Sequence, residues 1–147
     1  MQWLTVAYAM TAAACLTLAA VHLLVWSGQR ARLAHLAFAM TATSFAALTP
    51  FELWMARAQT PEEFGSAIRW MHIPGSIAIV SLVWFLWVHF GTGRRWLAWA
   101  VCGLRLLALA LNFAFTPNLN YRVITSVRQV AIFGLSLIHI SEPTRPY

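Results

Sequence analysis

Four apolar runs, each of about 20 residues or more, leave this chain few possible folds. They cover residues 4–26, 34–56, 69–90 and 96–116. Because a helix rises 1.5 Å per residue, each run can cross the ~30 Å hydrocarbon core of a bilayer. The 147-residue chain is 61% apolar and only 10% charged, whereas a water-soluble domain of this size needs a larger charged surface. We therefore expect an all-α fold: an integral membrane helical bundle with four complete transmembrane helices.

The charged residues predict the orientation of these helices. The net charge of +6 comes from arginine against a few glutamates, with no lysine or aspartate. The arginines are scattered and form no basic stripe, so nucleic-acid binding is not expected. Four arginines fall on each side of the membrane, but residues 27–33 and 91–95 are the shorter, denser connections, which favours the cytoplasmic side for them. The N-terminus and residues 57–68 are then expected outside.

The connection between the second and third runs contains the pattern of a helix start. Thr60 is followed by Pro61, Glu62 and Glu63. This order is typical of an N-cap, a proline at the first helical position and a capping box. The third helix therefore either begins near residue 69 or is continuous with a helix that starts after Thr60. Glu62 and Glu63 are more simply explained as helix-cap groups than as ligand groups.

A first candidate site combines Glu52 with Arg69 and His72. All three lie near the outer ends of the second and third helices. A carboxylate this close to hydrocarbon needs a partner, so we expect Glu52 to pair with Arg69 or His72. The group is either a polar ligand or proton site beneath helix kinks at Pro50 and Pro74, or an ion pair that holds the two helices together.

A second candidate site lies on the fourth helix. Arg105 is the one ionisable residue deep in an apolar run, and Asn112 lies on the same helix face. Facing lipid would cost an arginine several kcal/mol, so Arg105 should face the bundle interior or a wet cavity. Its partner is either Glu52 or a residue beyond this sequence. Arg105 and Asn112 join Glu52, Arg69 and His72 as candidates for ligand binding or signalling, and no catalytic residue is expected.

Three histidines near the cytoplasmic helix ends, His22, His35 and His89, raise the alternative of haem ligation. Histidines at one depth on different helices can supply axial ligands to haem. The chain has no second layer of histidines, so we expect no metal and no cofactor. Cys15 and Cys102 each stand alone in an apolar run and are expected to be free thiols.

Several spaced motifs across residues 1–134 carry a family resemblance. They are Glu52-Leu-Trp-Met, Thr60-Pro-Glu-Glu-Phe, Arg69-Trp-x-His-x-Pro, Gly103-Leu-Arg, Asn112-Phe and Asn118-Leu-Asn-Tyr-Arg. Together they resemble the N-terminal multi-helix membrane module of bacterial sensor histidine kinases, particularly those that continue into PAS domains and a kinase core. Pro50 departs from the family pattern and leaves the local helix shape open.

The resemblance implies a signal-input module of seven helices in the bacterial inner membrane, with its N-terminus outside. Such a module passes a helix rearrangement to a cytoplasmic kinase in a homodimer. No phospho-accepting histidine box, ATP lid or PAS domain is present. This fragment is therefore not expected to be an enzyme, although its full-length parent would be a histidine protein kinase. The alternatives are a haem-binding membrane redox protein and a transporter fragment.

The last thirteen residues, 135–147, resemble the conceptual translation of a transposase-type sequencing-library adaptor. Such segments are excluded from arguments about fold. We therefore expect two parts: an incomplete membrane input module at 1–134 and a non-native tail at 135–147. The natural reading frame is expected to continue past Gly134.

Overall fold

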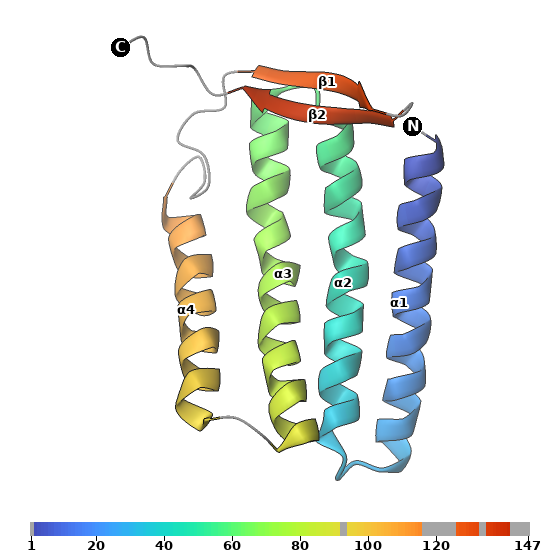
Figure 1. Ribbon diagram of the computed structural model, residues 1–147, viewed down its shortest axis with the longest axis vertical. Helices are drawn as coiled ribbons and strands as arrows, with labels where there is room; N and C mark the ends of the chain where they lie inside the picture. Colours follow the sequence, from blue (N-terminus) through green and yellow to red (C-terminus); the bar gives the residue numbers. More distant parts are fainter. Residues whose placement is uncertain (1, 92–93, 116–125, 133–134, 142–147) are drawn as a thin grey trace.

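The computed structural model describes residues 2–91, 94–115, 126–132 and 135–141. Its helices match the four apolar runs (Figure 1): α1 (Gln2–Gly28), α2 (Leu33–Arg57), α3 (Pro61–Phe90) and α4 (Arg95–Ala114). All four are long and apolar enough to cross a membrane. The all-α prediction with four helices of spanning length is therefore confirmed.

The start of α3 follows the predicted capping pattern. Thr60 has extended backbone geometry, and its hydroxyl accepts a hydrogen bond of 3.2 Å from the Glu63 N–H. The Glu63 carboxylate in turn accepts from the Gln59 N–H at 2.9 Å, one residue before the usual capping-box partner. The third helix is thus continuous from Pro61 and does not begin near residue 69.

The end of α3 is set by Gly91. Its backbone is left-handed, with φ of 60°, and its N–H donates to the Trp87 carbonyl at 3.1 Å. Glycine adopts this conformation without steric cost and commonly ends helices in this way. Pro50 and Pro74 do not end their helices, since α2 and α3 both run through them.

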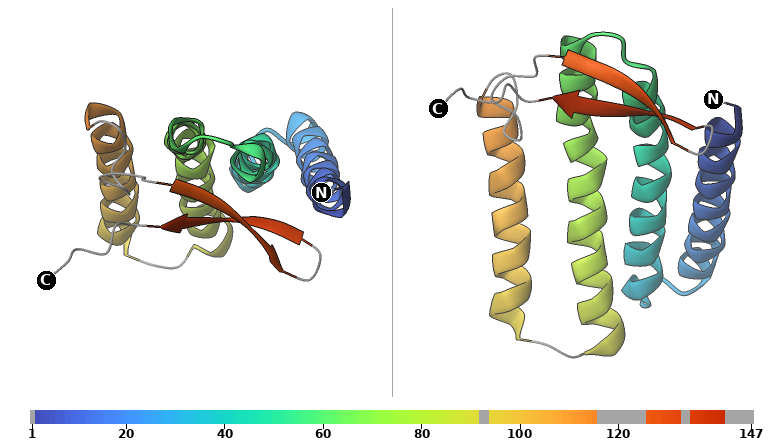
Figure 2. Two further views of the ribbon diagram at one scale, coloured as in Figure 1. Left: turned by 90° about the horizontal axis from the view of Figure 1, so that it is seen from above. Right: turned by 45° about the horizontal axis from the view of Figure 1, so that its top comes forward.

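The four helices stand in an open row (Figure 2), in which each helix packs on its neighbours in sequence. The α1–α2 connection, the end of α3 and the start of α4 lie at one end of the row, which we call the lower end (Figure 1). The N-terminus and the α2–α3 connection lie at the upper end. Since the row does not close into a bundle, α1 and α4 each leave one side without a neighbouring helix among the described residues.

Small side chains on α2 allow close packing on both of its sides. The buried set on this helix is Ala37, Ala39, Thr41, Ala42, Ser44, Ala46 and Thr49. A hydrogen bond of 2.9 Å joins the hydroxyls of Thr41 and Ser81 and ties α2 to α3. α2 is accordingly the most enclosed of the four helices, and α1 and α4 are the least enclosed.

Two antiparallel strands, β1 (Ser126–Ile132) and β2 (Leu135–Ser141), lie at the upper end of the row (Figure 1). The sequence analysis did not anticipate them. β2 falls within the segment that resembles an adaptor, and strand formation does not depend on the origin of a segment, so its foreign origin stays a prediction. Residues 116–125, including the Asn118–Arg122 motif and the expected end of the fourth run, lie outside the described residues.

Candidate functional site

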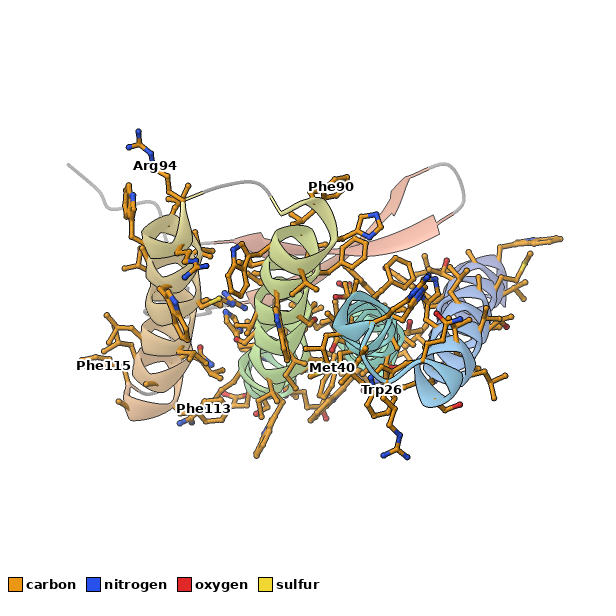
Figure 3. All side chains as sticks on the ribbon, turned by 90° about the horizontal axis from the view of Figure 1, so that it is seen from below. Trp26, Met40, Phe90, Arg94, Phe113 and Phe115 are labelled. Carbon is orange, nitrogen blue, oxygen red and sulfur yellow. The ribbon has the colours of Figure 1, made fainter. Side chains whose placement is uncertain are left out.

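The upper halves of α3 and α4 meet at a polar contact between Arg69 and residues 112–113. Asn112 has no solvent-exposed surface and is the only buried residue of α4. Its Nδ2 donates to the Arg69 carbonyl at 3.1 Å. In return, Arg69 Nη2 donates to the Phe113 carbonyl at 2.7 Å, and the guanidinium lies 5.1 Å from the centre of the Phe113 ring. Figure 3 labels Phe113 on α4, where its ring also meets Trp70 of α3 edge-on at 5.5 Å.

Arg105 lies against α3 at Gly75, deeper in the row. A Cβ atom placed on Gly75 would be 3.3 Å from Arg105 Nη2 and 4.0 Å from Leu48 of α2. A residue without a side chain therefore makes room for the guanidinium directly after Pro74. We use "the α3–α4 interface" for Arg69, Gly75, Arg105, Asn112 and Phe113.

The α3–α4 interface leaves polar atoms without partners. Arg69 Nε, Arg105 Nε and Asn112 Oδ1 are buried and make no hydrogen bond to any described residue. Among the residues that the structure describes, no carboxylate forms an ion pair with either arginine. A buried donor or acceptor without a partner costs about 1–3 kcal/mol, and more when the group is charged. The interface is thus positively charged and incompletely satisfied.

Glu52 does not take part in the α3–α4 interface. Its carboxylate lies close enough to the Tyr8 hydroxyl on α1 for an electrostatic interaction, whereas Arg69 faces α4. Glu52 and Arg69 form no ion pair among the described residues, because Arg69 is directed towards α4. The alternative pairing of Glu52 with His72 stays a prediction. His72 Nδ1 is 2.8 Å from the carbonyl of Ile68 on its own helix. Tyr8 was not among the residues predicted from the sequence, although a tyrosine at the level of Glu52 in an apolar run could have indicated this neighbour.

The three lower histidines do not converge on one site. His22 and His35 approach each other, with 3.1 Å between their Nδ1 atoms. His22 stacks on Phe38, Phe38 meets Phe85 edge-on, and Phe85 stacks on His89. Two phenyl rings therefore separate His89 from the histidine pair. Within the described ranges, no group of three histidine, cysteine, aspartate or glutamate side chains could hold a metal ion.

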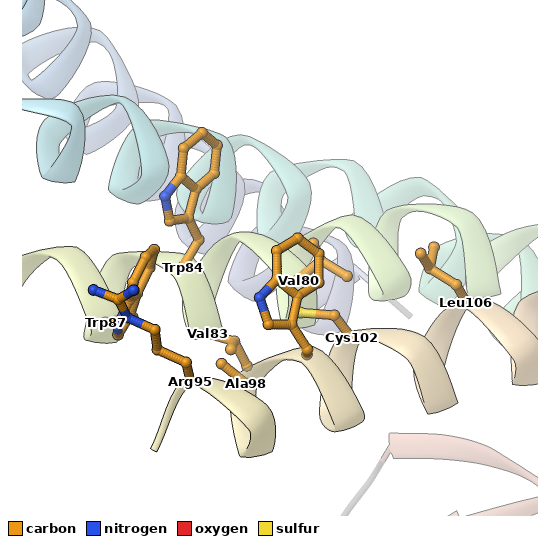
Figure 4. Close-up of a pocket in the computed structure, with 9 residues that line it drawn as sticks. Val80, Val83, Trp84, Trp87, Arg95, Ala98, Cys102 and Leu106 are labelled. Carbon is orange, nitrogen blue, oxygen red and sulfur yellow. The ribbon is translucent and has the colours of Figure 1, made fainter. Parts of the chain in front are cut away.

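Below the α3–α4 interface, the two helices line an open, apolar pocket of about 450 Å³ (Figure 4). Trp84 and Trp87 line it from α3, and Cys102, a free thiol, lines it from α4. Arg95 closes the lower edge, with its guanidinium 5.7 Å from the Trp87 ring centre. Such a pocket suits an apolar group such as an acyl chain, whereas the polar chemistry belongs to the interface above it.

Comparisons of this chain with models of protein families, with curated proteins and with solved structures find no match. The candidate site therefore rests on its own geometry. Its residues include three of the five that the sequence analysis singled out, namely Arg69, Arg105 and Asn112. Glu52 and His72 lie outside it.

Proposed function

We propose that this chain is the membrane-embedded signal-input part of a bacterial two-component sensor histidine kinase. Four helices of spanning length and the motifs at residues 52–74 and 103–122 support this proposal. In it, the chain crosses the inner membrane with its N-terminus and upper end outside. A cytoplasmic PAS and kinase region follows beyond residue 134, further helices complete the module, and the parent is a homodimer.

The observation that carries the proposal is the unpaired Arg105. Its Cα lies about 15 Å from that of Arg95 along α4, which is half of the ~30 Å hydrocarbon core. Ionisable groups at this depth are costly and usually serve function. An arginine that only stabilised the fold would be expected to have a carboxylate or carbonyl partner, and none is present among the described residues.

The proposed signalling movement is a shift of α4 against α3. The two helices share polar contacts in their upper halves and an apolar pocket in their lower halves. A change at the α3–α4 interface therefore alters the position of the lower end of α4, which is cytoplasmic in this proposal. A ligand shifts such an equilibrium only by binding one arrangement better than the other.

The first test is the gene itself. Sequencing the locus by a library method without transposase adaptors should replace residues 135–147 with a longer frame that encodes further helices, a PAS domain and a kinase core. Recovery of the same thirteen residues followed by a stop codon would refute the proposal.

The second test uses the full-length parent. Arg105→Gln should change the autophosphorylation rate at normal protein abundance, because it removes the charge at the α3–α4 interface. Arg95→Gln is the matched control, since it removes an arginine from the same helix at the lower end. Equal rates for wild type and both variants would contradict the proposed role of Arg105.

A further inference from the structure

Four buried side-chain polar atoms lack a partner in the described residues, and three of them lie between α3 and α4. These three are Arg69 Nε, Arg105 Nε and Asn112 Oδ1, all in the α3–α4 interface. The fourth, Trp26 Nε1, belongs to α1. Buried polar groups in proteins are normally hydrogen-bonded, so three in one interface indicate an absent partner rather than isolated defects.

The orientation of Asn112 is fixed by the backbone. Its amide nitrogen donates to the Arg69 carbonyl. Turning the amide over would place two acceptor oxygens against each other, so the Asn112 oxygen is the atom left free. This oxygen requires a donor, whereas the two arginine Nε–H groups require acceptors. The absent partner therefore needs both kinds of group.

The arginines define the charge of the partner. Among the described glutamates, Glu52 lies near Tyr8 of α1, Glu63 caps the start of α3, and Glu62 is exposed in the first turn of α3. None of them forms an ion pair with Arg69 or Arg105. Arg105 is also too deep to reach the head groups of either membrane surface, since it lies about 13–15 Å from both ends of α4. The described residues therefore leave the charge of both arginines unbalanced, and a bound anion would balance it.

Arg69 and Arg105 lie at different depths. Arg69 contacts Asn112, and Arg105 lies against Gly75. These neighbours place the two arginines about 9–10 Å apart in depth, measured along the helix axes. Arg69 is at the upper mouth, where the Phe113 carbonyl holds one of its nitrogens. Arg105 is at the deep end. A ligand that enters from the upper side meets Arg69 first and Arg105 last.

We propose that the α3–α4 interface binds a small oxyanion, carboxylate or phosphate, that carries a hydroxyl or amino donor beside its charged group. Guanidinium groups match the geometry of such oxyanions and bind them strongly. The anionic group binds between the two arginines, and the neighbouring donor satisfies Asn112 Oδ1 at the level of Arg69. The claim that this anion is the input signal rests on the proposed function. Anion binding itself can be measured on the chain alone.

The test is thermal unfolding of the purified chain in uncharged detergent, with each anion titrated at constant ionic strength against chloride. The matched probes are lactate and propionate, which differ by one hydroxyl, with inorganic phosphate and glycerol 3-phosphate beside them. A saturable rise in melting temperature is expected, with lactate binding more tightly than propionate. No saturable effect beyond that of chloride would overturn the proposal.

Variants locate the site. Arg105→Gln should weaken binding by about tenfold or more, which is the usual scale for losing a charge-assisted hydrogen bond. Arg95→Gln should leave affinity unchanged. Asn112→Asp places a carboxylate in the interface itself and removes the donor to the Arg69 carbonyl. It should abolish the anion effect, so it remains informative if Arg105→Gln fails to fold. Equal affinity in all three variants would refute the site.

Two further comparisons separate the sources of the anion and the two proposals. Stabilisation by phosphatidylglycerol in nanodiscs, in the absence of any effect of soluble anions, would assign the same oxyanion chemistry to a lipid head group at the Arg69 end of the interface. Binding that is present while the full-length parent shows no change in autophosphorylation would retain the site and refute the signalling role. If Arg105→Gln alters autophosphorylation but the wild-type chain binds no anion, the signalling role would be retained and the anion site refuted.

Discussion

Replacing Gly75 by alanine tests the placement of Arg105 directly. Glycine in the middle of a helix destabilises by roughly 0.5–1 kcal/mol relative to alanine, so the substitution should gain that amount if nothing is nearby. At Gly75 the new Cβ meets Arg105 Nη2 at 3.3 Å, and the guanidinium must move by a few tenths of an ångström. Gly103 on α4 has no atom within 4 Å of its Cβ position. Gly103→Ala should therefore show the whole gain, and Gly75→Ala less.

A double-mutant cycle isolates the contact. In an Arg105→Ala background, Gly75→Ala should recover its full helical gain, which gives a coupling of about 0.5 kcal/mol or more. Gly103→Ala should gain the same amount in both backgrounds. Unfolding free energies in detergent, measured under one set of conditions, provide the comparison. Equal gains at Gly75 with and without Arg105 would show that the guanidinium does not lie against α3, and the argument for the interface would fail.

Three other predictions follow from contacts and termini described above. Tyr8→Phe and Glu52→Gln should destabilise non-additively, with a coupling of about 0.5–1.5 kcal/mol in detergent unfolding, and additive effects would exclude the contact. Thr60→Ala should cost about 1 kcal/mol and speed hydrogen exchange in the first turn of α3, whereas Thr60→Ser should restore most of it; unchanged exchange would speak against the cap. In a background without native cysteines, a membrane-impermeant reagent should label a cysteine at Gln59 but not one at Gln29 in intact cells, and the opposite result would invert the topology.

The helices and their ends could be predicted from the sequence because they depend on near neighbours in the chain. The number of apolar runs of spanning length sets the number of helices. Thr60 and Glu63 interact across a single turn, and Gly91 bonds to a carbonyl four residues earlier. None of these features needs knowledge of which helix lies beside which.

The pairing between helices could not be predicted in the same way. Sequence position gives the depth of Glu52 and Arg69, and their depths agree. It does not give the direction in which each side chain leaves its helix, because these helices are apolar on all sides and have no polar stripe to orient them. The open row places α1 beside Glu52 and α4 beside Arg69. Asn112 was singled out by its helix face, but its burial against Arg69 required the arrangement of the row.

The apolar pocket beneath the α3–α4 interface has a physical consequence for a protein in a bilayer. Trp87 at its side is 39% exposed, so the pocket is open laterally. In a membrane, acyl chains would fill it. Fluid, unsaturated chains enter such a space readily, whereas stiff, saturated chains enter it poorly. The polar contacts of α4 with α3 lie near its upper end. The tilt of its lower end would therefore depend on how well acyl chains fill the pocket, and so on membrane fluidity and temperature.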